Sequence, residues 1–224
     1  MKVNTDGVLL GADVRLSKKM KTIVDIGTGT GVIALMVAER LSDLGVDDFS
    51  ILGVDIDAPS ALEAAENFAA SPWAKNLKAE KASLSDMEKR NALFDLIVSN
   101  PPYFDNSLHN PDGRKNAARH TSEGGLSYRT LVCYASEKLT ADGLLSIILP
   151  YGEKTALLRY AGSFGLYPSR ILCIKTTEKK EPSRMIAEFS RRRTGVMEEH
   201  LTLYKDGAAF KEYRSITEQF YINQ

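Results

Sequence analysis

The sequence has few of the residues that stabilise secreted, membrane-spanning or metal-binding proteins. Its only two cysteines, Cys133 and Cys173, lie far apart without metal-ligand or CxxC spacing, so we expect reduced thiols and a cytoplasmic location. Three scattered histidines make a poor metal set, and no bound metal is expected. No apolar signal region opens the chain, and no hydrophobic run approaches membrane-spanning length.

An excess of charge is also missing. The 224 residues include 29 Lys and Arg and 29 Asp and Glu, so any surface that binds nucleic acid must be a local patch. The apolar and charged fractions, 43% and 26%, are those of an ordinary globular protein. The length predicts a single α/β domain over residues 1–224, with a full core. Composition alone indicates no function.

Strand and helix patterns alternate along the chain. Buried-strand patterns separated by helical stretches occur at residues 22–26, 49–55, 77–83, 94–98 and 144–149. Two further β-like runs, 170–177 and 185–192, flank a charged turn and predict a hairpin. A short strand at 201–204 and a helical turn at 215–221 follow, whereas residues 3–16 are ambiguous. The pattern predicts a Rossmann-like, doubly wound, mostly parallel seven-stranded sheet with an antiparallel C-terminal edge hairpin.

A glycine-rich loop follows the first predicted strand and precedes a helix. Gly27, Gly29 and Gly31 let the backbone approach a ligand, and the helix after them presents free N–H groups. The dinucleotide fingerprint requires glycine where this sequence has Val32, so an oxidoreductase is disfavoured. The alternative is that the glycines serve only a tight turn.

Two acidic residues describe the ligand of this loop. Asp25 precedes the glycines, where a carboxylate suits an ammonium group better than a phosphate. Asp55 ends the second predicted strand and is placed to accept hydrogen bonds from both ribose hydroxyls of a nucleoside. A ligand with a ribose and a cationic amino-acid end but no pyrophosphate is indicated, and S-adenosylmethionine fits.

Asn100-Pro-Pro-Tyr103 follows the fourth predicted strand. The prolines cannot donate to a sheet ladder and force an extended backbone at Asn100, at the end of a strand where open α/β sheets bind ligands. The Asn100 carboxamide oxygen and the Pro101 carbonyl provide two acceptors, with Tyr103 and Phe104 as stacking faces. This corner suits a flat ring that carries an exocyclic NH2. An ordinary strand-ending turn is the alternative.

Asp25–Gly31, Val54-Asp55 and Asn100–Tyr103, in this order, resemble the class I amino-methyltransferases. Over essentially the whole chain the sequence is similar to the bacterial valine-tRNA adenine-N6 methyltransferases. The residues that carry this similarity are Met1–Gly11, Ala65–Ala74, Asn100–Phe104 and Phe220-Tyr221. The resemblance implies methyl transfer from S-adenosylmethionine to N6 of adenine 37, beside the anticodon, and we expect a monomer. The family usually carries a further segment before the residues that match Met1–Val3, and this sequence begins at those residues.

The resemblance also implies the site residues. We expect cofactor contacts from Asp25, Gly27, Thr28, Gly29, Gly31, Asp55, Ile56, Ser83, Leu84 and Asn100, and catalytic contacts from Asn100, Pro101, Pro102 and Tyr103. Ser83 departs from the family pattern, because relatives often place an aspartate there to accept the amino group of the cofactor adenine. A hydroxyl or a backbone carbonyl is expected to substitute.

Basic residues are the expected RNA contacts. The long polar segment 105–126 is typical of a functional loop, and residues 170–193 hold eight basic residues against three acidic ones. Any one of these charges is more simply explained as solvated surface, but as a set they are expected to flank the pocket. The predicted substrate contacts are Phe104, Arg114, Lys115, Arg119, Lys179, Lys180 and Arg184.

Other functions are less favoured. The Asn-Pro-Pro-Tyr motif also holds glutamine amides in protein-glutamine N5-methyltransferases, but those bring a helical amino-terminal domain for which this sequence has no room. A DNA adenine methyltransferase would need a target-recognition domain. A non-catalytic cofactor-binding subunit is opposed by the intact Asn100–Tyr103 motif. Phe68 and Trp73 are expected to pack in the core and not to stack on the substrate.

Overall fold

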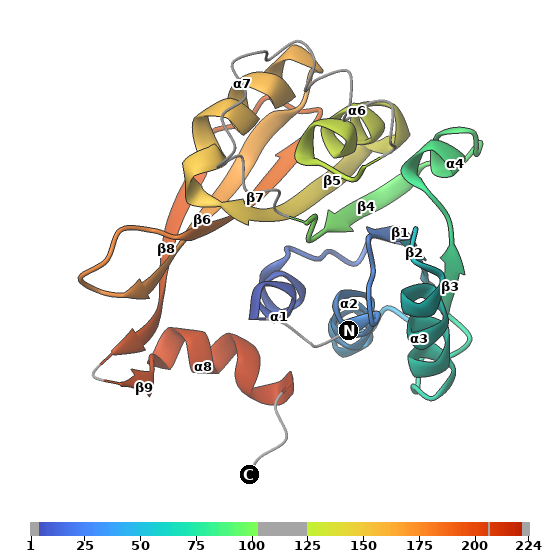
Figure 1. The fold of residues 1–224 in the computed structure, drawn as a ribbon, viewed down its shortest axis with the longest axis horizontal. Helices are drawn as coiled ribbons and strands as arrows, with labels where there is room; N and C mark the ends of the chain where they lie inside the picture. The colour runs from blue at the N-terminus through green and yellow to red at the C-terminus, as the bar shows by residue number, and fades with distance from the viewer. Residues whose placement is uncertain (1–4, 103–124, 206, 221–224) are drawn as a thin grey trace.

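The computed structural model describes residues 5–102, 125–205 and 207–220. One mixed sheet carries helices on both faces (Figure 1). Its order is β3-β2-β1-β4-β5-β7-β6-β8-β9. The strands are β1 Thr22–Ile26, β2 Ser50–Asp55, β3 Leu77–Lys81, β4 Phe94–Ser99, β5 Leu139–Pro150, β6 Tyr167–Thr177, β7 Arg184–Ser190, β8 Met197–Lys205 and β9 Ala208–Ala209. The helices are α1 Thr5–Asp13, α2 Val32–Asp43, α3 Ala58–Ala69, α4 Leu84–Glu88, α6 Tyr128–Lys138, η1 Tyr151–Glu153, α7 Lys154–Ser163, α8 Lys211–Thr217 and η2 Glu218–Phe220.

The parallel half of the sheet follows from the sequence pattern. β1 pairs in parallel with β2 and β4, β2 with β3, and β4 with β5. Helix starts are fixed by caps that can be read locally. The Asp57 carboxylate accepts the Ser60 N–H at the start of α3, and Ser127 accepts the Thr130 N–H at the start of α6. Because β1, β2 and β4 run in the same direction, their carboxyl ends meet at one edge of the sheet, which is called the carboxyl edge below.

Two hydrophobic clusters cover the two faces of the sheet. On one face α1, α2, α3 and α8 contribute side chains such as Leu9, Leu41 and Phe68, and in Figure 1 these helices lie below the sheet. On the other face α4, α6 and α7 contribute Met87, Leu131 and Leu157. Phe68 is buried and Trp73 packs against the first cluster, so their predicted place in the core is confirmed. No helix in the part of the chain that the structure describes is long and apolar enough to cross a membrane.

The fold class is confirmed, and the sheet differs from the prediction in two details. The described sheet has nine strands where seven were predicted. The antiparallel hairpin β6–β7 lies inside the sheet and not at its edge, because β8 pairs in parallel with β6 and carries β9 on its outer side. In β8, Leu201 and Leu203 are buried and Thr202 between them is only partly buried, which is the pattern of a strand with one covered face.

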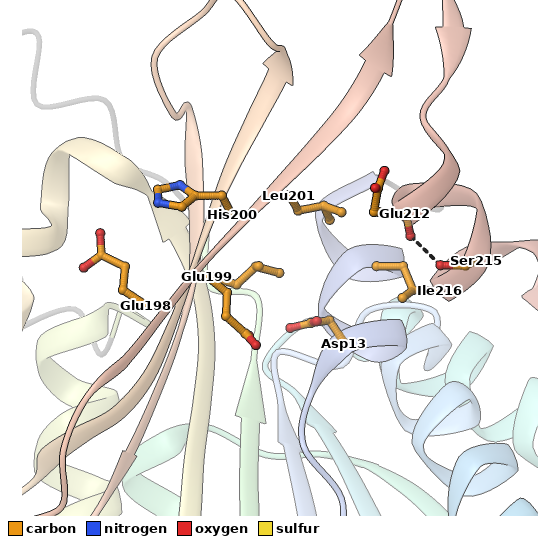
Figure 2. A pocket seen from close by; sticks show the side chains of 9 residues that line it. Asp13, Glu198, Glu199, His200, Leu201, Glu212, Ser215 and Ile216 are labelled. Atoms are coloured by element: carbon orange, nitrogen blue, oxygen red, sulfur yellow. Dashed lines mark hydrogen bonds between the residues drawn. The ribbon is translucent and has the colours of Figure 1, made fainter.

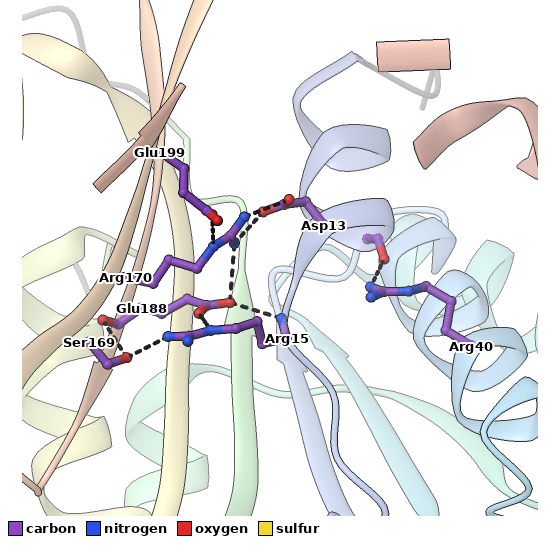
Figure 3. A network of polar contacts seen from close by, with 8 residues as sticks. Asp13, Arg15, Arg40, Ser169, Arg170, Glu188 and Glu199 are labelled. Carbon is purple, nitrogen blue, oxygen red and sulfur yellow. Dashed lines mark hydrogen bonds and ion pairs between the residues drawn. The ribbon is translucent and has the colours of Figure 1, made fainter. Parts of the chain in front are cut away.

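The ambiguous amino-terminal stretch is the helix α1, which is tied to the second half of the sheet. Arg170 of β6 donates to both carboxylate oxygens of Asp13, at 2.6 and 2.9 Å, and pairs with Glu199. Arg15, just after α1, donates its backbone N–H to the Glu188 carboxylate at 2.8 Å (Figure 3). The Arg170 side chain is only 9% exposed, so it braces the fold, and its predicted place in an RNA-facing set is wrong.

Candidate active site

The glycine loop follows β1 at the carboxyl edge and has a conformation that needs glycine. Gly27 and Gly31 have φ of 73° and 83°, in the left-handed region that side chains disfavour. A Cβ on Gly31 would lie within 2.4 Å of the Phe68 ring, so the loop also packs too closely against α3 for a side chain. The loop is held by the Gly27 and Thr28 amides, which donate to the Val54 carbonyl at 2.8 and 3.0 Å.

Asp25 is fully buried at the end of β1, beneath the loop. Its Oδ2 accepts the Thr28 hydroxyl at 2.7 Å, and Oδ1 has no hydrogen-bond partner among the described residues. Burial raises the pKa of this carboxyl from 3.8 to about 7, against the lowering effect of the Thr28 and Ala34 hydrogen bonds. A buried acceptor of this kind favours a cationic donor that is not part of the fold.

Asp55, at the end of β2, contacts the same loop. Its carboxylate accepts the Gly29 N–H at 3.0 Å through one oxygen and the Asp57 N–H at 2.9 Å through the other. Because an ionised carboxylate has about four lone-pair sites, these two bonds leave acceptor capacity for ribose hydroxyls. Ile56, the next residue, is 60% exposed and offers an apolar surface beside this carboxylate.

Ser83 caps the short helix α4. Its hydroxyl accepts the Asp86 N–H at 3.1 Å and donates to the Asp86 carboxylate at 2.6 Å, in a reciprocal capping box. This bond lowers the pKa of the Asp86 carboxyl, together with the Ser83 amide. The Ser83 carbonyl accepts the Asp86 and Met87 amides, both at 3.1 Å, so the hydroxyl and the backbone carbonyl that were expected to replace the family's aspartate are both engaged in the start of α4. Leu84 is half-buried and packs against the second hydrophobic cluster.

Asn100 follows β4 at the same edge. β4 pairs with β1 so that Val98 lies opposite Asp25, and the buried Ser99 hydroxyl donates to the Ile26 carbonyl at 2.7 Å. These contacts fix the strand end from which Asn100 emerges next to the glycine loop. Asn100 is half-buried, Pro101 is buried and Pro102 is exposed. The motif therefore presents its first residues at the edge where the ligand-binding loop lies.

The predicted contacts in the long loop cannot be placed. Tyr103, Phe104, Arg114, Lys115 and Arg119 lie outside the described residues.

The hairpin residues of the predicted RNA contact lie beyond the carboxyl end of β5. Pro150, the last residue of β5, pairs with Arg184, so the turn that precedes β7 extends past this edge. Lys179 and Lys180 are exposed in that turn. Arg184 pairs with Asp6 of α1 at 3.0 Å.

Three other arginines of the same basic run lie at the opposite edge. Arg191 donates to the carbonyl of Leu139, the first residue of β5, at 3.2 Å, and Arg192 pairs with Asp142. The Arg193 guanidinium lies 5.1 Å from the ring centroid of Tyr167, the first residue of β6. Their expected place beside the pocket is therefore wrong. β7 begins at the carboxyl edge and runs antiparallel to β5, so the residues that follow it lie at the opposite edge.

Two residues that the sequence analysis missed support the loop. The Asn67 amide of α3 donates to the Thr30 carbonyl at 2.9 Å and so fixes the loop backbone. Leu126 lies against Gly27, where a Cβ would come within 2.8 Å of its side chain. Asn67 interrupts an alanine-rich helix and was a signal that could have been used, whereas nothing local marks Leu126.

A separate open hollow of about 500 Å³ lies between β8, α1 and α8 (Figure 2). Its lining includes Asp13, Glu198, Glu199, Glu212 and His200. None of its lining residues belongs to the glycine loop or to the Asn100 motif, and its acidic lining is unsuited to RNA. The described residues include no group of three or more His, Cys, Asp or Glu that could hold a metal ion.

The residues at the carboxyl edge fit the ligand predicted from the sequence. The orphaned Asp25 oxygen suits an ammonium group, and the glycine loop leaves space that a Cβ would fill. Asp55 retains acceptor capacity beside the exposed Ile56. These features together describe a site for a nucleoside with a cationic tail.

Comparisons with known proteins agree with this description. Residues 8–154 match the family described as "Methyltransferase small domain". A tRNA1(Val) (adenine(37)-N6)-methyltransferase of Bacteroides fragilis is 37% identical over 225 residues, covering 99% of this chain and 91% of the relative. The protein of the same name from Photorhabdus laumondii is 36% identical, covering 99% and 89%.

Solved structures show the same fold at low identity. A predicted O-methyltransferase from Agrobacterium tumefaciens superimposes with a TM-score of 0.71 at 16% identity, covering 96% of both chains. The methyltransferase subunit of a type I restriction-modification system from Streptococcus thermophilus gives 0.59 at 16% identity, covering 96% of this chain and 50% of that one. At this identity the similarity establishes the fold alone.

Proposed function

The chain belongs to the tRNA1(Val) (adenine(37)-N6)-methyltransferase family, and we propose that it methylates the exocyclic N6 of adenine 37 in valine tRNA, with S-adenosylmethionine as the methyl donor. We further propose that it acts in the cytoplasm and as a monomer, in one domain, since the proposed cofactor and amine contacts all lie on one chain. The observation that carries the proposal is the position of Asn100 and Pro101 directly after β4, the strand that pairs with β1 beside Asp25.

The cofactor contacts follow from the carboxyl edge of the sheet. Asp25 is proposed to face the ammonium group, and Asp55 the ribose hydroxyls, with Gly27, Gly29 and Gly31 giving backbone access. Ile56 and Leu84 supply apolar contact with the adenine ring, beside Ser83 at the start of α4. When bound, S-adenosylmethionine supplies a methyl group on a positively charged sulfur, which makes that methyl electrophilic.

The enzyme's own task is to orient a poor nucleophile. The lone pair of an adenine amine is delocalised into the ring, so the amine must pyramidalise before it reacts. Asn100 Oδ1 and the Pro101 carbonyl are proposed to accept its two N–H groups and to hold it in that geometry. These bonds strengthen as positive charge develops on the nitrogen, so they stabilise the transition state more than the bound substrate. Alignment of this kind supplies about 7–11 kcal/mol in favourable systems.

The remaining steps need little from the protein. A methylated aminium is strongly acidic and loses its proton without a dedicated base. Tyr103 and Phe104 are proposed to stack on the adenine, which leaves an anticodon loop at low cost because its bases are already partly unstacked. Lys179, Lys180 and Arg184 beyond β5, with Arg114, Lys115 and Arg119 of the long loop, are proposed to contact phosphates.

Replacing Asn100 tests the proposal. Asn100→Ala removes one of two acceptors for the amine, so kcat should fall on the order of 10²–10³-fold. The affinity for S-adenosylmethionine, measured by calorimetry, should remain near wild type. Activity is measured as labelled methyl transfer to tRNA from cells that lack the gene, followed by nucleoside analysis for N6-methyladenosine.

Two results would contradict this assignment. Equal loss of cofactor affinity and turnover in Asn100→Ala would mean that Asn100 shapes the cofactor pocket and does not hold the amine. If the wild-type enzyme methylated a glutamine-containing protein and left tRNA unmodified, the substrate would be a protein and not tRNA. Ser42→Ala, on α2 and away from the proposed contacts, is the matched control.

A further inference from the structure

A cation and aromatic rings gather where α6 meets α7. The exposed Arg129 places its guanidinium 4.9 Å from the ring centroid of Tyr160 and 5.4 Å from that of Tyr128. The two tyrosine rings meet edge to face at 6.3 Å, and Phe164 extends the group, 5.0 Å from Tyr160. We call Tyr128, Arg129, Tyr160 and Phe164 the aromatic platform.

The aromatic platform is close to the proposed active site. Leu126 lies against Gly27 of the glycine loop, and Tyr128 and Arg129 follow it by two and three residues. Three residues of chain span at most about 11 Å, so Arg129 is anchored within that distance of the residue that contacts the loop. The Ser127–Thr130 capping box fixes the backbone between them, with the Ser127 N–H donating to the Thr130 hydroxyl at 3.0 Å.

The chemistry of the aromatic platform fits a nucleobase. Arginine planes and aromatic rings are the surfaces on which proteins stack the unpaired bases of RNA loops. Arg129 is exposed and Phe164 is 37% exposed, so part of the group is open to solvent. The opposite possibility is that Arg129 only joins α6 to α7. A purely structural role predicts a loss of stability and no loss of RNA affinity when Arg129 is replaced.

We propose that the aromatic platform binds a base that neighbours the target adenine in the anticodon loop, with the Arg129 guanidinium stacked on that base. The inference rests on the proposed tRNA substrate and adds a second recognition point to it. Asn100 and Pro101 select the amine, and the platform fixes the register of the loop, so that the adenine at one position enters the site.

The first measurement is binding of a valine-tRNA anticodon stem-loop by fluorescence anisotropy at fixed salt. Arg129→Ala should weaken binding about tenfold, within the range measured for loss of one base–aromatic contact. Arg129→Lys keeps the charge but loses the plane, so it should recover little of this affinity. Arg192→Ala removes an exposed arginine from the opposite edge and should bind like wild type. Affinity for S-adenosylmethionine should be unchanged in all three.

The second measurement locates the base. Stem-loops with an abasic nucleotide on either side of the target adenine should bind wild-type enzyme about tenfold more weakly on one side only. Arg129→Ala should show no further loss with that stem-loop, because the contact is already missing. An abasic penalty that is equal in wild type and Arg129→Ala would overturn the proposal, as would equal binding by Arg129→Ala and Arg192→Ala.

The two proposals fail in different ways. If wild type methylates the stem-loop but Arg129→Ala binds and reacts normally, only the aromatic platform is overturned. If wild type neither binds nor methylates the stem-loop, the tRNA function fails and the platform fails with it. Loss of cofactor affinity in both Arg129 variants would show a structural effect on the glycine loop through Leu126, and would also overturn the proposal.

Discussion

Asp25 and Glu188 are both fully buried carboxylates in the same sheet, yet their surroundings are opposite. They lie in one row across the strands, because Asp25 pairs with Val98, Val98 with Ser146, and Ser146 with Glu188. At about 4.8 Å per strand they are roughly 14 Å apart. Glu188 faces Arg170 at 3.7 Å and also pairs with Arg15. Asp25 has only uncharged partners, and its Oδ1 has no hydrogen-bond partner among the residues that the structure describes.

The difference separates a brace from a binding site. The Glu188 carboxylate is paired with two arginines of the same chain, Arg15 and Arg170, so its charge is balanced within the fold. At Asp25 the charge-balancing partner is missing from the described chain, so burial raises the pKa to about 7. Buried groups that the fold leaves unsatisfied are candidates for function. One row of the sheet therefore contains a carboxylate that stabilises the fold, Glu188, and one that is a candidate for ligand binding, Asp25.

Removing the buried guanidinium of Arg170 should have the largest effect on the free energy of unfolding. Arg170→Met leaves Asp13, Glu188 and Glu199 around an apolar side chain, and breaking a buried pair in this way lowers the free energy of unfolding by about 3–5 kcal/mol. Urea unfolding measures it, with Arg159→Met, an exposed arginine on α7, as the control expected within about 0.5 kcal/mol of wild type. If the free energy of unfolding changed as little as in the control, the Arg170 network would not stabilise the fold, and Glu188 would not differ from Asp25 in this respect.

Asp25→Asn should act in the opposite direction. Between pH 4 and pH 7 the folded, cofactor-free protein keeps a proton on Asp25 that the unfolded chain has lost, so wild-type stability falls as pH rises through this range. The amide cannot ionise and avoids this penalty. The free energy of unfolding of the variant should therefore equal that of wild type at pH 4. At pH 8 it should be higher by as much as about 4 kcal/mol, because wild type loses about 1.4 kcal/mol for each pH unit between the two pKa values.

Cofactor affinity gives the second half of this test. An ionised Asp25 attracts the ammonium group, so wild-type affinity for S-adenosylmethionine should rise as pH increases through about 7, whereas Asp25→Asn should bind weakly with a flat profile. Urea unfolding and calorimetry at pH 5 and pH 8 measure both effects. If Asp25→Asn were destabilising at both pH values, Asp25 would be a structural carboxylate like Glu188.

The sequence predicted one of these carboxylates and not the other. Asp25 stands in a local pattern of strand, acid and glycines, which constrains both its position and its ligand. Glu188 and Arg170 stand in a run of basic residues that reads as charged surface. Arg170 meets Asp13 across 157 residues, a contact that no local pattern contains. The parallel half of the sheet was predictable for the same reason, because each strand–helix unit has its own periodicity.

The second half of the chain was harder to predict because its pairing is non-local. The hairpin β6–β7 was recognised from its turn, but β8 enters in parallel beside β6 after a connection that has no helical pattern. The basic residues at the two ends of the hairpin look alike in sequence, and only the strand directions separate Lys179 and Lys180 at the carboxyl edge from Arg191–Arg193 at the other.

The smallest effect is expected from a third carboxylate, at the exposed end of α1. Asp6 pairs with Arg184 at 3.0 Å, and the side chains are 21% and 36% exposed. Exposed pairs of this kind contribute about 0–1 kcal/mol, so Asp6→Asn should change the free energy of unfolding by less than about 1 kcal/mol. It also removes a carboxylate that competes with RNA phosphate for Arg184. Affinity for the anticodon stem-loop should therefore rise, by no more than about fivefold. Urea unfolding and anisotropy measure the two effects, and an unfolding change as large as that of Arg170→Met would show that α1 is braced at both ends and not only at Asp13.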